Sequence, residues 1–558
     1  MEAVIAAMRA NLGSASVQIA ACGAIAALAG NSVPDRTIGS GPVRHGSVLD
    51  ASAMKRRKSA YPPTVGAAPS QEPAAKDLRA EKDANRLLLA KLGIIDSLMS
   101  VMRAHSGVSA VQTNACWALC AVTGPELINS IAARTGALDS ILSAMRGHVS
   151  EAALQQHACG AIANIATNQD NKVMLVKNGA ASSVLQAMRE HPHVPHVQCN
   201  GCHALWNLSS VDDHKYILPG MGAIDVTLEA LKKHQSDASV QESAFGVLKN
   251  LSTIPENQAV LGRLGAGEIV VGGMKAHPSS PVLQELGCYV LWNLSKSSEN
   301  RNSLFGYGAT KAIVSAVESN AASASLLITA CAAMATLAED STQIQTQLAK
   351  NGALECIIAG VRLHNVVHMV KKNGCWALYV LTLPEEVGLA AIKLGVVDFL
   401  LLAMKTHTMD ISLQEHACGG LCNIANPNEN IYAMAKAGVF EVLINAMREH
   451  VSEATLQKHC AKAIWRLGRN AENKVLASKL GAIEVLAAAL RQHPRDAGVQ
   501  EMACGALRAL AMNGKNKAQI VQTNAGELAL AAIKAHPGIP GLHEQASALC
   551  SIAGLAVR

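Results

Sequence analysis

Apolar residues recur with a helical period along nearly the whole chain. In "GAIEVLAAALRQHP", residues 481–494, Ile483, Leu486 and Leu490 share one helical face, and Pro494 closes the segment. A longer amphipathic stretch is typified by "DASVQESAFGVLKNLS", residues 237–252, with apolar positions spaced i, i+3 and i+4. A shorter one is "PENQAVLGRLGA", residues 255–266, where a proline suits the first turn and a glycine can end the helix. These patterns predict a unit of three helices.

The unit repeats. A histidine anchor recurs every 43 residues, with Asn320 in one vacant register and a step of 44 from Asn320 to the next anchor. The anchors are His105, His148, His191, His234, His277, His364, His407, His450, His493 and His536. Twelve residues before each anchor stands a glycine, replaced only at the last anchor by Asn524. Such self-similarity at a fixed period indicates a repeat architecture.

The order of helices resembles the armadillo repeat: a short first helix ending at a glycine, a second helix, and a long third helix with a small residue midway and an asparagine near its end. Segments such as "SAMRGHVSEAALQQHACGAIANIA", residues 143–166, are similar to the armadillo segments of leucine-rich-repeat kinases and of vacuolar armadillo scaffolds. The resemblance implies an all-α, armadillo-type, right-handed superhelical solenoid of 43-residue three-helix repeats, with about eleven units.

The first unit is split. Asn11 aligns with His105, and Cys22 aligns with Cys116, so the chain begins partway through a repeat. The residues that follow are rich in Pro, Gly, Ser, Ala and charge, a composition that cannot build a core. We therefore expect a partial N-terminal armadillo repeat over residues 1–31, a disordered insertion over 32–83, and the armadillo solenoid over 84–558. The insertion contains one basic cluster: Lys55, Arg56, Arg57 and Lys58.

Composition supports the helical prediction and narrows the function. Apolar residues make up 50% of the chain but aromatic residues only 3%, which argues against a β-sandwich or barrel. The net charge of +6 is small against 48 basic and 42 acidic residues, which argues against a nucleic-acid partner. No apolar run is long enough for a transmembrane segment. We expect the cytoplasm as the location, and the nucleus as well if the basic cluster is a localisation signal rather than a kinase site at Ser59 or a solvated run.

Two motifs suggest bound metal or haem, and the repeat explains both. Cys199, Cys202 and His203 have the spacing of covalent haem attachment, but Cys202 occupies the register in which other repeats also carry a buried cysteine. His191 belongs to a short histidine cluster, yet it is the ordinary anchor of its repeat. The sequence also lacks a phosphate-binding glycine loop, GxSxG and HExxH. We therefore expect no catalytic residue, no metal and no cofactor, and we expect that the protein is not an enzyme.

An asparagine recurs sixteen residues after the anchor, late in the third helix, at Asn164, Asn207, Asn250, Asn293 and Asn423. Asparagine is a poor residue for helix interiors. Two explanations stay open. The amide satisfies free carbonyls near the helix end, or it faces a groove, where the armadillo resemblance implies that it holds the backbone of an extended partner.

Residues four positions earlier share the helix face with these asparagines. The predicted partner-binding groove comprises Trp117, Asn164, His203, Asn207, Asn250, Tyr289, Asn293, Trp376, Asn423, Lys462 and Arg466. In nuclear-import adaptors a tryptophan and an asparagine stand four apart in one repeat, but here Trp117 is followed by Ala121, and Trp376 by Val380. Import of basic signals is therefore disfavoured.

The sequence thus favours a non-enzymatic scaffold that binds an extended or helical segment of another protein. Two alternatives stay open: a transport adaptor whose basic insertion occupies its own groove, and the armadillo portion of a larger kinase or ubiquitin ligase. Neither end of the chain shows a polar capping repeat, so self-association through the ends is also expected.

Overall fold

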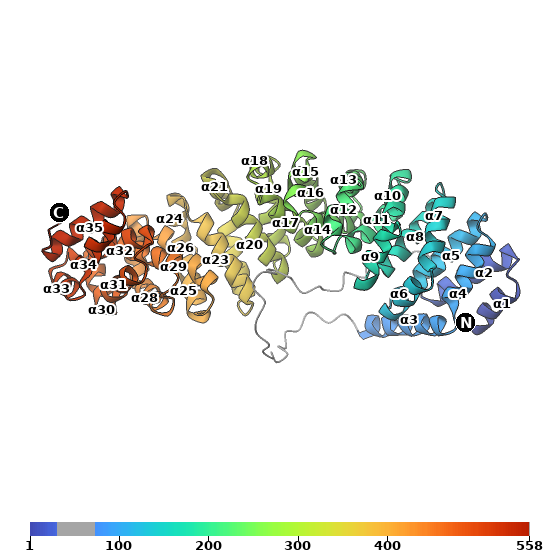
Figure 1. The fold of residues 1–558 in the computed structure, drawn as a ribbon, viewed down its shortest axis with the longest axis horizontal. Helices are drawn as coiled ribbons and strands as arrows, with labels where there is room; N and C mark the ends of the chain where they lie inside the picture. Colours follow the sequence, from blue (N-terminus) through green and yellow to red (C-terminus); the bar gives the residue numbers. More distant parts are fainter. Residues whose placement is uncertain (31–72, 557–558) are drawn as a thin grey trace. The chain divides into compact units, whose positions relative to one another are not determined.

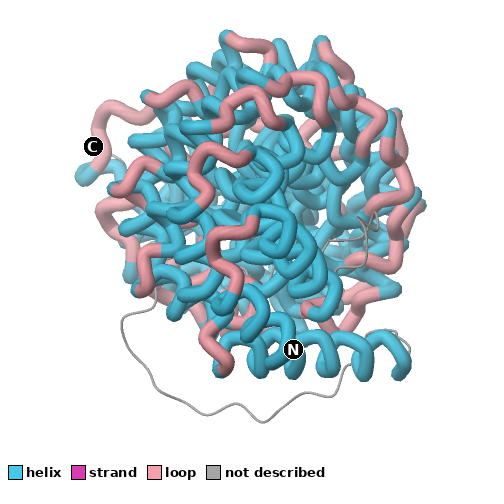
Figure 2. The backbone as a smooth tube through the Cα atoms, turned by 90° about the vertical axis from the view of Figure 1, so that its right-hand side faces the viewer, coloured by secondary structure: helices cyan, strands magenta, loops and turns pink. Residues whose placement is uncertain are grey.

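The computed structural model describes residues 1–30 and 73–556. Within these residues the chain forms 35 helices joined by loops, without a strand (Figure 2). The basic cluster Lys55, Arg56, Arg57 and Lys58 lies outside the described residues. The helices fall into two compact units, Met1–Asn257 and Gln258–Arg558, which meet within helix α15 (Pro255–Arg263).

The N-terminal unit is built from stacked repeats of first, second and third helices (Figure 1). Each third helix packs on the third helix of the next repeat, and each second helix on the next second helix. The first helices are α3 (Pro73–Lys91), α6 (Glu126–Arg134), α9 (Gln169–Lys177) and α12 (His214–Gly220). The second helices are α1 (Glu2–Ala10), α4 (Ile94–Ala104), α7 (Ala137–Gly147), α10 (Ala180–Glu190) and α13 (Ala223–Lys233). The third helices are α2 (Ala15–Leu28), α5 (Ser109–Val122), α8 (Ala152–Ile165), α11 (Pro195–Leu208) and α14 (Ala238–Leu251).

The C-terminal unit repeats the same arrangement (Figure 1). Its first helices are α18 (Ser298–Gly306), α21 (Thr342–Lys350), α24 (Glu385–Lys393), α27 (Asn428–Lys436), α30 (Ala471–Leu480) and α33 (Gly514–Gln522). Its second helices are α16 (Ala266–Ala276), α19 (Ala309–Ser319), α22 (Ala353–Leu363), α25 (Val396–Thr406), α28 (Val439–Glu449), α31 (Ala482–Gln492) and α34 (Ala525–Ala535). Its third helices are α17 (Pro281–Ser295), α20 (Ala324–Ala338), α23 (His368–Leu381), α26 (Ile411–Ile424), α29 (Ala454–Leu467), α32 (Ala497–Ala511) and α35 (Pro540–Ala553).

Helix α3 corrects one sequence prediction. Residues 73–83 were expected to belong to a disordered insertion, but α3 begins at Pro73. The segment after this proline is rich in Ala, Leu, Arg, Glu and Lys, which are strong helix formers, and proline suits a first helical turn. Helices α1 and α2, which precede the insertion in sequence, pack on α4 and α5, which follow it.

The junction between first and second helices requires a left-handed backbone. Gly395, for example, has φ of 79°, a conformation that glycine adopts without a Cβ penalty. At the last junction Asn524 takes φ of 58°, and asparagine is among the few other residues that visit this region routinely. Asn524 therefore takes the same left-handed backbone conformation as the glycines at the other junctions.

A buried glutamine closes the end of most second helices; α19, α22 and α34 lack it. Gln155, seven residues after its anchor, donates from Nε2 to the carbonyls of Met145, at 2.8 Å, and His148, at 3.0 Å. The last carbonyls of a helix lack intrahelical donors, so this amide satisfies the buried Met145 carbonyl and adds a second bond to the His148 carbonyl, which also accepts the Glu151 N–H. The same pair of bonds is made by Gln18, Gln112, Gln198, Gln241, Gln284, Gln414, Gln457 and Gln500. Sequence reasoning gave this glutamine no role.

In the described part of the chain, no individual helix has both the length and the apolar character to cross a bilayer. Taken together, α24 and α25 meet that criterion, but they are bent by 79° at their junction.

Replacing Gln155 with methionine is expected to lower the free energy of unfolding by about 1–3 kcal/mol, because the change keeps the volume but leaves the buried Met145 carbonyl without a donor. Chemical denaturation checks the value. The neighbouring half-buried Gln156, changed to methionine, is the matched control and should cost much less. Equal losses in the two variants would contradict the capping role.

Candidate partner-binding surface

The third helices carry the residues predicted to line a groove. In the N-terminal unit, successive third helices α5, α8, α11 and α14 present Trp117, Asn164, His203, Asn207 and Asn250, all half-buried. In the C-terminal unit, α17, α23, α26 and α29 present Tyr289, Asn293, Trp376, Asn423, Lys462 and Arg466. The structure therefore brings the predicted residues together as two sets, one in each unit. We call each set, with its neighbours on the same helices, a third-helix face.

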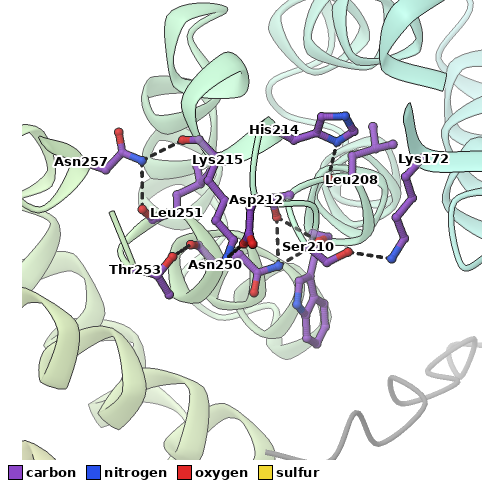
Figure 3. Close-up of polar contacts among 12 residues, drawn as sticks. Lys172, Leu208, Ser210, Asp212, His214, Lys215, Asn250, Leu251, Thr253 and Asn257 are labelled. Atoms are coloured by element: carbon purple, nitrogen blue, oxygen red, sulfur yellow. Dashed lines mark hydrogen bonds and ion pairs between the residues drawn. The ribbon is translucent and has the colours of Figure 1, made fainter. Parts of the chain in front are cut away.

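The asparagine amides join one third helix to the preceding one. Asn207 Nδ2 donates to the carbonyl of Ala163 at 2.9 Å, and Asn164 Nδ2 donates to the carbonyl of Cys120 at 3.0 Å. Asn250 Nδ2 bonds the carbonyl of Trp206 and the hydroxyl of Ser209, both at 3.1 Å, and Figure 3 shows its surroundings. Asn423 Nδ2 bonds the carbonyl of Tyr379 at 3.0 Å in the other unit. These bonds form a ladder with the period of the repeat.

The ladder shows that the asparagine nitrogens satisfy backbone carbonyls, which was the first of the two explanations drawn from the sequence. The carbonyls belong to the preceding repeat rather than to the asparagine's own helix end. The oxygens are different. Within the described residues the Oδ1 atoms of Asn164, Asn207, Asn250 and Asn423 accept no hydrogen bond, and the side chains are half-buried rather than enclosed. Each oxygen is therefore an acceptor available to a bound chain.

Asn293 departs from this pattern. It is only 1% exposed, and its Oδ1 accepts a hydrogen bond from Lys296 Nζ at 2.8 Å. The same ammonium lies 4.7 Å from the centre of the Trp292 ring. Because its acceptor is occupied, Asn293 does not offer the open oxygen that the other four asparagines share.

Aromatic rings of one repeat lie over glycines of the next. A Cβ added at Gly419 would lie 2.6 Å from the Tyr379 ring, and one at Gly505 would lie 2.7 Å from the Trp465 ring. Trp206 lies over Gly246 in the same way. A side chain larger than glycine at these positions would therefore clash with the ring, which stands fifteen residues after the anchor of its own repeat. The sequence alone did not reveal this pairing.

Histidines lie against aromatic rings of the third helices and stay neutral. Trp117 stacks on His157 and Trp376 on His416, each with ring centroids 6.0 Å apart, while the His459 ring is tilted against Tyr379 at 5.4 Å. Burial lowers the pKa of His157, His416 and His459 to about 4. Sequence reasoning missed these three residues, although they stand nine after the anchor, one helical turn before the predicted lining.

Most anchor histidines join the repeats; His407 is an exception, because its buried Nε2 has no hydrogen-bond partner among the described residues. His148 Nε2, for example, bonds the carbonyl of Ser106, in the turn of the preceding repeat, at 2.7 Å. In the vacant register Asn320 Nδ2 bonds the carbonyl of Pro278 at 2.8 Å, so the amide substitutes for the imidazole. A third ladder comes from first-helix asparagines such as Asn257, which bonds the carbonyls of Leu251 and Lys215, both at 2.9 Å (Figure 3).

The chemistry of the third-helix faces suits recognition. They combine rings, amide oxygens and cations such as Lys462 and Arg466. The fifteen cysteines are free thiols, and burial raises the pKa of those such as Cys159, to about 12. Among the described residues no three His, Cys, Asp or Glu side chains are grouped to hold a metal ion.

Comparison with known proteins gives the relationship. The family described as LRRK2 ARM repeat matches residues 173–455, half of the chain. The chain belongs to this armadillo-repeat family. Armadillo solenoids generally mediate protein–protein interaction. No curated protein matches the chain.

Two solved structures show the same armadillo-like fold. A crystal structure of an engineered protein is 21% identical, with a TM-score of 0.61, and the alignment covers 74% of this chain and 98% of that one. A second, described as a conserved phosphorylation switch controlling the interaction between cadherin and beta-catenin, is 16% identical, with a TM-score of 0.70. Its alignment covers 86% of this chain and 96% of that chain.

Changing Asn207 to aspartate is expected to destabilise the armadillo stack by about 1–3 kcal/mol, because a carboxylate oxygen would face the Ala163 carbonyl where the amide now donates. Thermal and urea unfolding measure the loss. Asn302, exposed on first helix α18, gives a control when it is changed to aspartate. An unaltered Asn207→Asp protein would show that the ladder contributes nothing.

The stacked histidines predict acid sensitivity. Because the pKa of each in the folded protein, about 4, lies below the ordinary 6.5, the unfolded chain binds protons first as the pH falls. Stability should therefore decrease from about pH 6.5 to about pH 4. A His157→Phe/His416→Phe/His459→Phe variant keeps the rings and should show a flatter pH profile in urea titrations. The exposed His193→Phe control should follow the wild type. Parallel profiles for the triple variant and the wild type would contradict this account.

Proposed function

We propose that the protein is a non-catalytic scaffold whose third-helix faces bind an extended or helical segment of a partner protein. The observation that supports this most directly is the row of open Oδ1 acceptors on successive stacked helices, flanked by half-buried rings.

The spacing of the row fits an extended chain. Packed helices lie about 8–10 Å apart. An extended strand rises about 3.3 Å per residue, so successive asparagine oxygens stand about two to three residues apart along the partner. The N–H groups of alternate residues point the same way, which lets them meet such a row. The asparagine nitrogens are already bonded, which fixes the direction of each oxygen before the partner arrives and lowers the ordering cost of binding.

The rings would supply apolar area between the polar contacts. In the N-terminal unit Trp117 stacks on His157 and Trp206 lies over Gly246, so the rings are held in place by the fold itself. Rigid aromatic side chains in such positions are the residues that carry most of the binding energy at interfaces. The neutral histidines avoid adding charge at these points.

We place this function in the cytoplasm. The fifteen free cysteines fit a reducing compartment, where disulfides are rare.

The test is a selection of binding peptides from a random display library, followed by affinity measurement on variants. A Trp117→Ala/His203→Ala/Trp376→Ala variant should weaken the selected binders by tenfold or more, because it removes side chains from both third-helix faces. The asparagines are unsuitable for this purpose because their removal would disturb the ladder.

The matched control removes exposed side chains from the first helices: Leu127, Tyr216 and Tyr432, which are 59%, 62% and 57% exposed. Each becomes alanine. Binders weakened by the control set and unaffected by the third-helix variant would place the site on the first helices and refute the proposal. A selection that yields no specific binder would count against a peptide-binding scaffold.

A further inference from the structure

Third helix α29 is unlike every other third helix in the charges it carries. The face positions eight, twelve, sixteen and nineteen residues after the anchor are Lys458, Lys462, Arg466 and Arg469. In the neighbouring α26 the same four positions hold Glu415, Gly419, Asn423 and Asn426. No other third helix has more than one cation at these positions. We call these four residues, three on α29 and Arg469 in the turn that follows it, the basic stripe.

The stripe is not neutralised by the fold. Within the described residues no carboxylate forms an ion pair with any of its four cations. Nearby Arg508 on α32 differs, because it pairs with Glu544 at 3.2 Å. Cations grouped without counter-charges raise the local concentration of anions, so the fold leaves a charge that an anionic partner would complement.

Two of the cations are also held in place. Arg466 Nη1 donates to the carbonyl of Cys422 at 2.6 Å, which is the ladder bond that an asparagine makes in other repeats. Arg469 Nη1 reaches the carbonyl of Asn426 at 3.5 Å. A guanidinium has five N–H donors, so most remain for a carboxylate.

The surroundings favour a peptide. On one side Asn423 offers an open Oδ1 to a main-chain N–H, and on the other Trp465 lies over Gly505 and offers apolar area. Glu415 and Glu501 occupy the first of the four positions on the flanking helices α26 and α32. The positive charge is therefore confined to one helix and the turn after it. From Lys458 to Arg466 it covers about 12 Å at 1.5 Å per residue, which is short for tracking a nucleic-acid backbone.

We propose that the basic stripe is the docking site for an acidic, extended segment of the partner protein, whose Asp or Glu side chains pair with Lys458, Lys462, Arg466 and Arg469. This rests on the proposed scaffold function and names the partner's chemistry in the C-terminal unit. The acidic segment would run along α29, across the row of asparagines. Carboxylates on alternate residues of an extended strand are about 6.6 Å apart, close to the rise of about 6 Å between Lys458, Lys462 and Arg466, which stand four apart.

The neighbouring repeats supply a variant that should fold. The variant is Lys458→Gln/Lys462→Ala/Arg466→Asn/Arg469→Asn. Each new residue already stands in the same register of another repeat, as Gln156, Ala332, Asn423 and Asn426 do. Asparagine at position 466 can restore the ladder bond to the Cys422 carbonyl. The control is Lys350→Gln/Lys393→Gln/Lys436→Gln/Lys479→Gln, which removes the same charge from exposed first-helix positions of the same unit. Circular dichroism melts verify that both variants fold.

The probes are a fluorescein-labelled twelve-residue peptide of alternating Glu and Ser, its Gln and Ser counterpart, and a labelled twelve-nucleotide oligothymidine, each titrated by anisotropy at two salt concentrations. We expect the acidic peptide to bind the wild type and the control at least tenfold tighter than the stripe variant, with an affinity that falls with salt. The Gln peptide should bind at least tenfold more weakly.

Three results would overturn the proposal: no binding of the acidic peptide to the wild type, equal binding to the stripe variant, or an oligothymidine that binds as tightly as the acidic peptide. The scaffold function is judged separately by the display-selected peptides. If those peptides bind the third-helix faces and bind the stripe variant as tightly as the wild type, while the acidic peptide fails its own test, the scaffold function stands and only the acidic-partner assignment fails.

Discussion

Every helix end leaves carbonyl groups without a donor, and a protein of short helices has many such ends to satisfy. Here side chains supply the donors at fixed registers. Gln155 closes the second helix of its own repeat, while Asn207 and His148 bond carbonyls of the preceding repeat. Each bond is worth only about 1 kcal/mol, but an unmade one would cost more. Many carbonyl groups at helix ends therefore receive a donor only when the repeats stack.

These ladders reach only from one repeat to the next. The bonds of the amides and imidazoles span 41 to 45 residues in sequence, which is one repeat. Stability should accordingly be a sum of repeat and neighbour terms, as in other solenoids. Because each bond needs only the adjacent repeat, α1 and α2 can join the stack although an insertion follows them in sequence. His105 Nε2 bonds the carbonyl of Leu12 at 2.6 Å, as later anchors bond carbonyls of their preceding repeats.

Much of this was predictable from spacing. Apolar periodicity and the glycine junctions predicted the three helices, and the recurring asparagine predicted a face of the third helix. The partners were not predictable, because a register tells which residues are equivalent but not which carbonyl lies opposite. Asn293 shows the limit: it shares the register of Asn207, yet Lys296 occupies its oxygen. The start of α3 was missed since composition rich in alanine and charge suits both a linker and a helix.

Arg466 shows how one repeat can differ from the others and still stack on its neighbour. Its guanidinium closes the ladder bond that an asparagine closes elsewhere, and it still projects charge from the same position. The requirement for stability is met by one donor, which amide and guanidinium share, while the remainder of the side chain is free to vary. A repeat can therefore exchange the chemistry it displays without loosening its neighbours, so ligand preference can drift along the array one repeat at a time.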